Sequence, residues 1–148
     1  MIIEPLFEGE LSEQYTHIVE ITFADIAALA TGATGNLAIA SLKAGDVFGN
    51  VTLWLDTAFV FSDASVVSFA ATVGDSTSAT ADLASTELAS AGTTVLGKAG
   101  TSKVIQLATN TKNIYFTGTS AHNINTATAG KVILAYTKVS FTAAARGF

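Results

Sequence analysis

The chain has 148 residues, a formal net charge of −5 at pH 7, a sequence pI of about 4.7 and charged side chains at 13% of its positions. This length fits one domain, and the acidic balance argues against a nucleic-acid partner, because binding to phosphates needs a basic surface. The chain has no cysteine, which excludes disulfides and thiolate chemistry.

The chain is also apolar, with a mean hydropathy of +0.48. Even so, its longest apolar candidate, residues 23–42, is interrupted by an aspartate, two glycines and an asparagine. A membrane helix needs about 18 uninterrupted apolar residues and is therefore not expected. Glu4 and Glu8 occupy positions at which a signal peptide would carry basic residues. A surface with so few charges is typical of a chain that is covered by partners.

Residues 1–14 combine acidic and apolar side chains and predict an N-terminal arm in front of a domain over residues 15–148. The acidic members are Glu4, Glu8, Glu10 and Glu13, and the apolar ones are Ile2, Ile3, Leu6, Phe7 and Leu11. This combination suits an arm that lies across a partner with an apolar groove and a basic rim. Leu6 and Phe7 are therefore candidate interface residues.

The rest of the chain reads as short strands with period-two alternation. They are predicted over residues 15–23, 37–42, 50–60, 66–73, 93–96, 103–109, 113–119 and 131–141, and glycine-rich turn signals separate most of them. Tyr15 and His17 are expected on the same face as Val19, and Ile105 on the same face as Leu107. Only "ADIAALA" (residues 24–30) and "ADLASTELA" (residues 81–89) suggest helical turns. About eight strands predict an all-β, single-domain, jelly-roll-like β-sandwich.

Three aromatic residues are further candidates for an interface. Trp54 alternates away from the Leu53 and Leu55 face, and Tyr115 alternates away from its neighbours. An outward ring is covered by its own chain, anchors an interface or serves as a platform for carbohydrate, and the sequence leaves these alternatives open. Tyr136 belongs to a last strand that is apolar on both faces, which is typical of the middle of a sandwich or of a subunit interface.

Residues with catalytic or metal-binding chemistry are few and scattered. His17 and His122 are the only histidines, without companions at ligand spacing, so a zinc site is not expected. Asp75 and Asp82 flank a loop of small residues, and whether they bind a calcium ion stays open, because Ca²⁺ prefers six to eight oxygen ligands. No paired acid and base is present. The chain is therefore expected to be neither an enzyme nor a cofactor-binding protein.

The charges are also unevenly distributed along the chain. Every acidic residue lies at or before Glu87, and every basic residue except Lys43 lies at or after Lys98. This order indicates either two differently charged solvated faces or a contact in which one end of a subunit meets the opposite end of a neighbour.

Two runs carry a resemblance to a known family: "FVFSDASVVSFAATVGDSTSATADLASTELASAGTTV" (residues 59–95) and "NIYFTGTSAHNINTATAGKVILAY" (residues 113–136). Over residues 15–141 the chain resembles the capsid decoration (cement) proteins of tailed bacteriophages. The resemblance implies a jelly-roll-like homotrimer, made in the host cytoplasm, that sits on the outer capsid surface of the virion. There it would clamp neighbouring major capsid subunits, without membrane or nucleic-acid contacts. The arm has no counterpart in this resemblance.

A binding module remains the alternative. A phage fibre or receptor-binding domain can use the same β-sandwich, with Trp54 or Tyr115 as a platform for a sugar. Aromatic side chains gathered on one exposed concave face, next to Asp or Asn side chains, would favour it.

Overall fold

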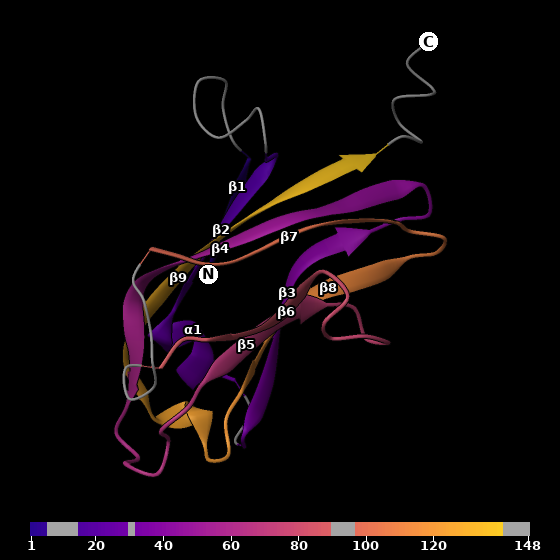
Figure 1. Cartoon of the computed structure of the whole chain (residues 1–148). Coiled ribbons are helices and arrows are strands. Elements are labelled where there is room, and N and C mark those ends of the chain that lie inside the picture. The colour runs from indigo at the N-terminus through magenta and orange to yellow at the C-terminus, as the bar shows by residue number, and fades with distance from the viewer. Residues whose placement is uncertain (6–14, 30–31, 90–96, 141–148) are drawn as a thin grey trace.

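The computed structural model of the chain describes residues 1–5, 15–29, 32–89 and 97–140 (Figure 1). The described part contains nine strands and two very short helices. They are β1 (Ile2–Pro5), β2 (His17–Thr22), α1 (Phe23–Ala27), β3 (Thr34–Leu42), β4 (Asp46–Phe61), β5 (Ala70–Gly74), β6 (Leu83–Glu87), β7 (Gly97–Leu107), β8 (Lys112–Thr119), the 3-10 helix η1 (Ile124–Thr126) and β9 (Ala127–Ser140). No helix in these ranges is long and apolar enough to cross a membrane.

The strands form two antiparallel sheets that face each other (Figure 1). Sheet A has the order β1-β2-β9-β4-β7, and sheet B has the order β3-β8-β5-β6. The hydrogen-bonded pairs β2·β9, β3·β8, β4·β7 and β5·β6 are nested in the sequence. A long hairpin that is rolled up into two sheets has this nesting, and it is the topology of a jelly roll. The predicted jelly-roll-like β-sandwich is confirmed.

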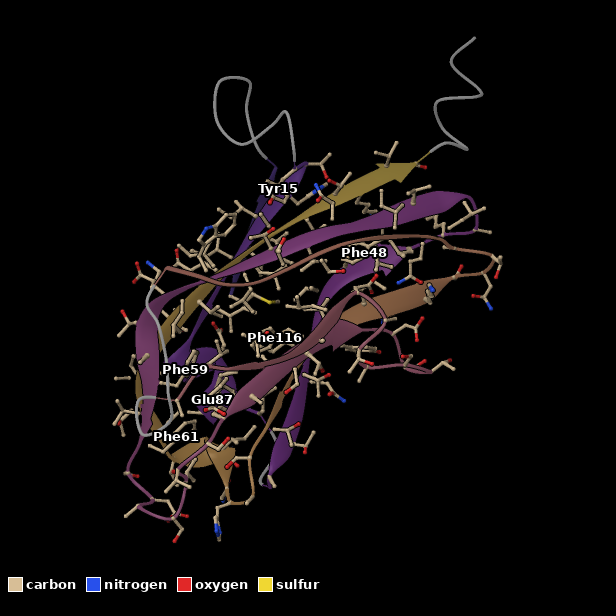
Figure 2. All side chains as sticks on the ribbon, in the orientation of Figure 1. Tyr15, Phe48, Phe59, Phe61, Glu87 and Phe116 are labelled. Atoms are coloured by element: carbon tan, nitrogen blue, oxygen red, sulfur yellow. The ribbon has the colours of Figure 1, made fainter. Side chains whose placement is uncertain are left out.

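The core lies between the two sheets and follows from the alternation of the strands. Leu53 and Leu55 of β4, Val132 and Leu134 of β9 and Phe116 of β8 are all at most 1% exposed. Figure 2 shows Phe48, Phe59 and Phe116 between the sheets. Gly118 of β8 lies directly under Phe69, since a Cβ at this glycine would stand 2.6 Å from the ring. The aromatic side chains therefore fill the sandwich to the point where only glycine fits beneath one of them.

Two predicted elements differ from the structure. Residues 83–87 of the predicted helical turn form strand β6, which pairs with β5 through Leu83 opposite Val73 and Glu87 opposite Ala70. The carboxylate of Glu87 accepts hydrogen bonds from the backbone N–H groups of Phe69 and Ala89, at 2.8 and 3.0 Å. The pairing with β5 and the hydrogen bond from Phe69 outweigh the helix propensity of alanine, which is a weak preference.

The predicted arm is in part a strand. Ile2 to Pro5 form β1, which pairs with β2 of the same chain and extends sheet A at its edge. Residues 6–14, and with them Leu6 and Phe7, lie outside the described residues, as does the predicted strand over residues 93–96. The predicted turn at residues 24–30 is confirmed in its first half, where α1 begins after Thr22. The backbone N–H of Thr22 donates to the Asp25 carboxylate at 2.8 Å, as in a capping box.

Candidate interaction surfaces

The outer face of sheet A carries exposed aliphatic side chains. At one end Val47 of β4 lies opposite both Leu107 of β7 and Val139 of β9, and Ile105 lies opposite Gly49. Since Phe48, between Val47 and Gly49, is buried in the core, these neighbours point outward. Leu107, Ile105 and Val139 are 62%, 61% and 36% exposed. We call Val47, Ile105, Leu107 and Val139 the aliphatic cluster.

A second apolar group lies at the other end of the same outer face. Here Ile133 of β9 stands between Trp54 of β4 and Glu20 of β2, and Glu20 stands opposite Ile2 of β1. Ile2, Ile18, Glu20 and Ile133 line a shallow hollow of about 80 Å³. Ile2 is 53% exposed, whereas Trp54 and Ile133 are half-buried. The outer face of sheet A therefore carries large aliphatic side chains at both ends.

Tyr15 covers the middle of this face, although it was predicted to share the core face with Val19. Its hydroxyl hydrogen-bonds to the Thr52 hydroxyl at 2.6 Å, and its ring meets the edge of Trp54 at a centroid distance of 5.9 Å. Thr52 and Trp54 point away from the core side chain Leu53 between them, so Tyr15 lies on the outer side of sheet A (Figure 2). β2 begins only at His17, and the alternation that was extended to Tyr15 does not hold before the strand starts.

Tyr136, a predicted interface residue, lies instead in the core. It is 2% exposed, its ring packs against Phe48, and its hydroxyl donates to the Ile39 carbonyl at 3.0 Å. Burial raises the pKa of Tyr136 to about 12. Little of this ring is exposed, because the inner face of a central strand packs against the opposite sheet. Of the two positions that the sequence left open for this strand, Tyr136 occupies the one in the middle of the sandwich.

His17 stacks on Tyr136, with ring centroids 5.2 Å apart and planes 8° from parallel. Burial, and then the nearby positive charge of Lys138, lower the pKa of His17 below its ordinary 6.5. Together with Ile3 and Ile39, these residues line an open groove between the edges of the two sheets. His122 is exposed in the loop between β8 and η1. No three His, Asp or Glu side chains converge anywhere in the described ranges.

The outer face of sheet B is polar and nearly uncharged. Its strands present Asn36, Thr72, Asn113, Thr117 and Thr119, and Asn36, Thr117 and Thr72 form one row across β3, β8 and β5. Tyr115 is half-buried on this face, where it lines a hollow of about 300 Å³ with Asn36, Asp75, Ser76 and Thr117. Tyr115 and Trp54 therefore lie on opposite outer faces of the sandwich and do not form a joint aromatic platform.

A polar network fastens the loop between β5 and β6 to strands β7 and β8. Asp75 receives the Lys112 ammonium at 3.0 Å and the backbone N–H groups of Thr77 and Ser78 at 2.9 and 2.8 Å. Lys112 also donates to the Gln106 side-chain oxygen, and the Gln106 amide nitrogen donates to both carboxylate oxygens of Asp82 at 2.8 Å. The two carboxylates that raised the calcium question thus each have protein donors.

The two carboxylates titrate differently. The backbone hydrogen bond from Ser78, followed by the contact with Lys112, lowers the pKa of Asp75. Asp82 is only 1% exposed, and this burial raises its pKa from 3.8 to about 6. Asp75, Lys112 and Asp82 form a charged hub that holds the loop of small residues between β5 and β6. Its buried member, Asp82, has a pKa of about 6.

Comparison with known proteins adds one structural likeness. No protein-family model matches the sequence, and no curated protein is similar to it in sequence. Among solved structures, the fold matches a chain of the capsid asymmetric unit of cyanophage Pam1, with a TM-score of 0.52 and 21% sequence identity. The match covers 82% of this chain and 80% of that chain. The two chains share one fold.

The aliphatic cluster was not recognised from the sequence as a surface. The shared face of Ile105 and Leu107 was predicted, and the structure confirms it, but a paired aliphatic face is normally a core face. The sequence did contain one indication that the two faces of this strand differ. Gln106, between Ile105 and Leu107, makes the opposite face of the strand less apolar. That signal separates the faces without telling which of them lies outside.

Proposed function

We propose that the protein is a structural component of a tailed-phage virion, which binds the outer surface of the capsid as a homotrimer and cements contacts between major capsid subunits. The observation that supports this best is the likeness in fold, over about four fifths of both chains, to a chain from a phage capsid. The sequence resemblance to capsid decoration proteins points the same way. The proposed role is one of binding and involves no catalysis.

The fold by itself does not decide the function, because jelly rolls also occur in lectins and cupins. What favours a permanently assembled protein is the chemistry of the outer face of sheet A. Ile105 and Leu107 are both more than 60% exposed in a chain with only 13% charged residues. Such side chains gathered on one face are typical of a surface that another protein covers.

The proposal is tested with particles of the phage that encodes the chain, prepared without this protein. Purified protein is added, and particles are separated from free protein by sedimentation. We expect bound protein at a stoichiometry near that of the major capsid subunit, and particles that keep their DNA to a higher temperature. Protein that stays entirely in the supernatant at tens of micromolar would refute the capsid role.

A second candidate function is carbohydrate or receptor binding, and the hollow beside Tyr115 is the observation that favours it. An aromatic ring next to Asn36, Asp75 and Thr117 offers both an apolar platform and hydrogen-bonding groups. Binding to a glycan array that Tyr115→Ala abolishes and Trp54→Ala preserves would support this reading. Absence of any glycan binding by the parent protein would remove it.

A further inference from the structure

We propose that the outer face of sheet A binds a second copy of this chain, with the aliphatic cluster of Val47, Ile105, Leu107 and Val139 at the centre of the contact. This inference rests on the homotrimer of the proposed function and assigns a surface to it. It leaves sheet B and the connecting loops for contacts with the shell.

The exposed apolar side chains are distributed unequally between the sheets. The large hydrophobic residues that are exposed in the described part of the chain are Met1, Ile2, Ile3, Phe23, Val60, Val67, Val104, Ile105, Leu107 and Val139. Seven of the ten belong to strands of sheet A, and none belongs to a strand of sheet B. Of these seven, Ile2, Ile105, Leu107 and Val139 lie on the outer face of sheet A, so this side of the sandwich has more apolar surface to cover than sheet B has.

The composition of the cluster favours a like copy over a transient partner. Interfaces between proteins that fold separately and meet later are about as apolar as ordinary surface, whereas permanent homo-oligomer interfaces resemble a divided core. The row Leu107–Val47–Val139 and the adjacent row Ile105–Gly49–Thr137 contain no charged residue. A neighbouring copy, which also carries a net charge of −5, therefore meets no carboxylate in these rows.

The local shape of the face suits close packing. Gly49 is buried, and a Cβ at this position would stand 3.0 Å from Cγ1 of Ile105 and 2.6 Å from its Cα. Ile105 therefore lies flat over the glycine of the neighbouring strand. A low, aliphatic surface of this kind can be covered closely by a neighbouring copy, which in a three-fold ring meets it with a different part of its own surface.

The area of the face matches what a stable contact needs. Sheet A has five strands, and at about 4.8 Å per strand it is about 24 Å wide. Ten residues along the central strands, at about 3.3 Å each, give a length of about 33 Å. The product is about 800 Å², which equals the area that each partner contributes to a standard protein–protein interface.

The test compares two side chains of equal exposure on different parts of the molecule. Ile105 in the cluster and Val67 in the β4–β5 connection are both 61% exposed. Light scattering should give three times the 15.1 kDa of one copy for the parent and for Val67→Asp. Ile105→Asp should raise the dissociation constant between copies at least about thirtyfold and give monomers, as expected for a buried anchor residue. Circular dichroism confirms that both variants are folded.

A second measurement does not depend on disrupting the contact. Because the chain has no cysteine, Ile105→Cys and Val67→Cys each introduce a single thiol. We expect a thiol reagent to modify the first variant at least tenfold more slowly than the second while the protein is assembled. The two rates should converge on dilution below the dissociation constant.

The outcomes separate this inference from the proposed function. A parent protein that is monomeric at tens of micromolar, or an Ile105→Asp variant that remains a trimer, overturns the inference. Sedimentation with particles then decides the capsid role independently. If Ile105→Asp remains a trimer and loses only particle binding, the face contacts the shell, which refutes the assignment to a second copy while the capsid role stands.

Discussion

The two outer faces of the sandwich are built from the same kind of alternating strand but present opposite chemistry. Sheet A shows Ile105, Leu107 and Val139 to the outside, whereas sheet B shows Asn36, Thr72 and Thr117 in its corresponding positions. Both sheets bury equally apolar inner faces. The proposed contact with a second copy rests on this difference between the outer faces.

The comparison also extends to charge. Beside sheet B, the hub of Asp75, Lys112 and buried Asp82 ties a loop down through titratable groups. On the outer face of sheet A the described ion pair is that of Glu20 and Lys131, at 3.5 Å and more than one third exposed. We therefore expect pH to change stability through the groups beside sheet B. The association of copies should depend on the apolar side chains of sheet A and respond little to salt.

The largest expected effect comes from the aromatic side chains on the two outer faces. Trp54→Ala removes a ring that packs against Tyr15 on sheet A, and burial of such a side chain is worth roughly 2–3 kcal/mol. We expect weaker assembly of copies and weaker particle binding, measured by light scattering and sedimentation. Tyr115→Ala on sheet B is the matched control and should leave the association of copies unchanged. Equal effects of both variants on the association of copies would contradict the proposed difference between the two outer faces.

Deletion of residues 1–14 tests the edge of sheet A. The deletion removes β1, including the exposed Ile2, but leaves β2 paired with β9. We expect a folded eight-stranded sandwich with lower affinity for its partner copy or for the shell. Replacing Glu4, Glu8, Glu10 and Glu13 by glutamine should have a smaller effect that shrinks at high salt. Full-strength binding by the truncated chain would show that the segment contributes nothing to association.

The hub beside sheet B should be visible in the pH dependence of stability. The pKa of Asp82 in the folded chain, about 6, lies above its ordinary 3.8, so the folded state binds this proton more tightly than the unfolded state does. This group therefore makes the free energy of unfolding fall as pH rises from about 4 to about 6. Between pH 4.5 and pH 7.5 the free energy of unfolding of Asp82→Asn should rise relative to that of the parent by on the order of 2 kcal/mol.

His17 acts in the opposite sense in a neighbouring range. Its pKa lies below 6.5 in the folded chain, so it contributes stability that is present above pH 6.5 and lost as pH falls. Denaturant titrations of the parent, Asp82→Asn and His17→Gln at several pH values separate the two contributions. A difference between Asp82→Asn and the parent that does not change with pH would mean that Asp82 titrates normally.

The smallest expected effect is that of the Glu20–Lys131 pair. Exposed ion pairs of this kind contribute about 0–1 kcal/mol, and salt screens them. A double-mutant cycle with Glu20→Gln and Lys131→Met should give a coupling energy below about 0.5 kcal/mol that vanishes in 1 M salt. A coupling several times larger would mean that electrostatics contribute substantially to this largely apolar face.

Several features of the protein could be read from the sequence because they depend on neighbours along the chain. Alternation predicted the all-β class, the inward side chains Val51, Leu53 and Leu55 of β4 and the two apolar faces of β9, and the structure confirms each of them. Thr57, which the alternation places on the same inward face, is exposed. β-Branched and aromatic residues at alternate positions encode this pattern locally, so no knowledge of the partner strand is needed.

Only the tertiary structure decided how those faces are used. The sequence named Trp54, Tyr115 and Tyr136 as interface candidates, and the structure places one on each outer face and one in the core. It also turned an alanine-rich segment into β6, through pairing with β5. A period of two distinguishes the faces of a strand but does not say which of them meets the opposite sheet. That assignment comes from pairing between strands far apart in sequence, such as β2 with β9 and β4 with β7, whose partners and registers local residue preferences do not encode.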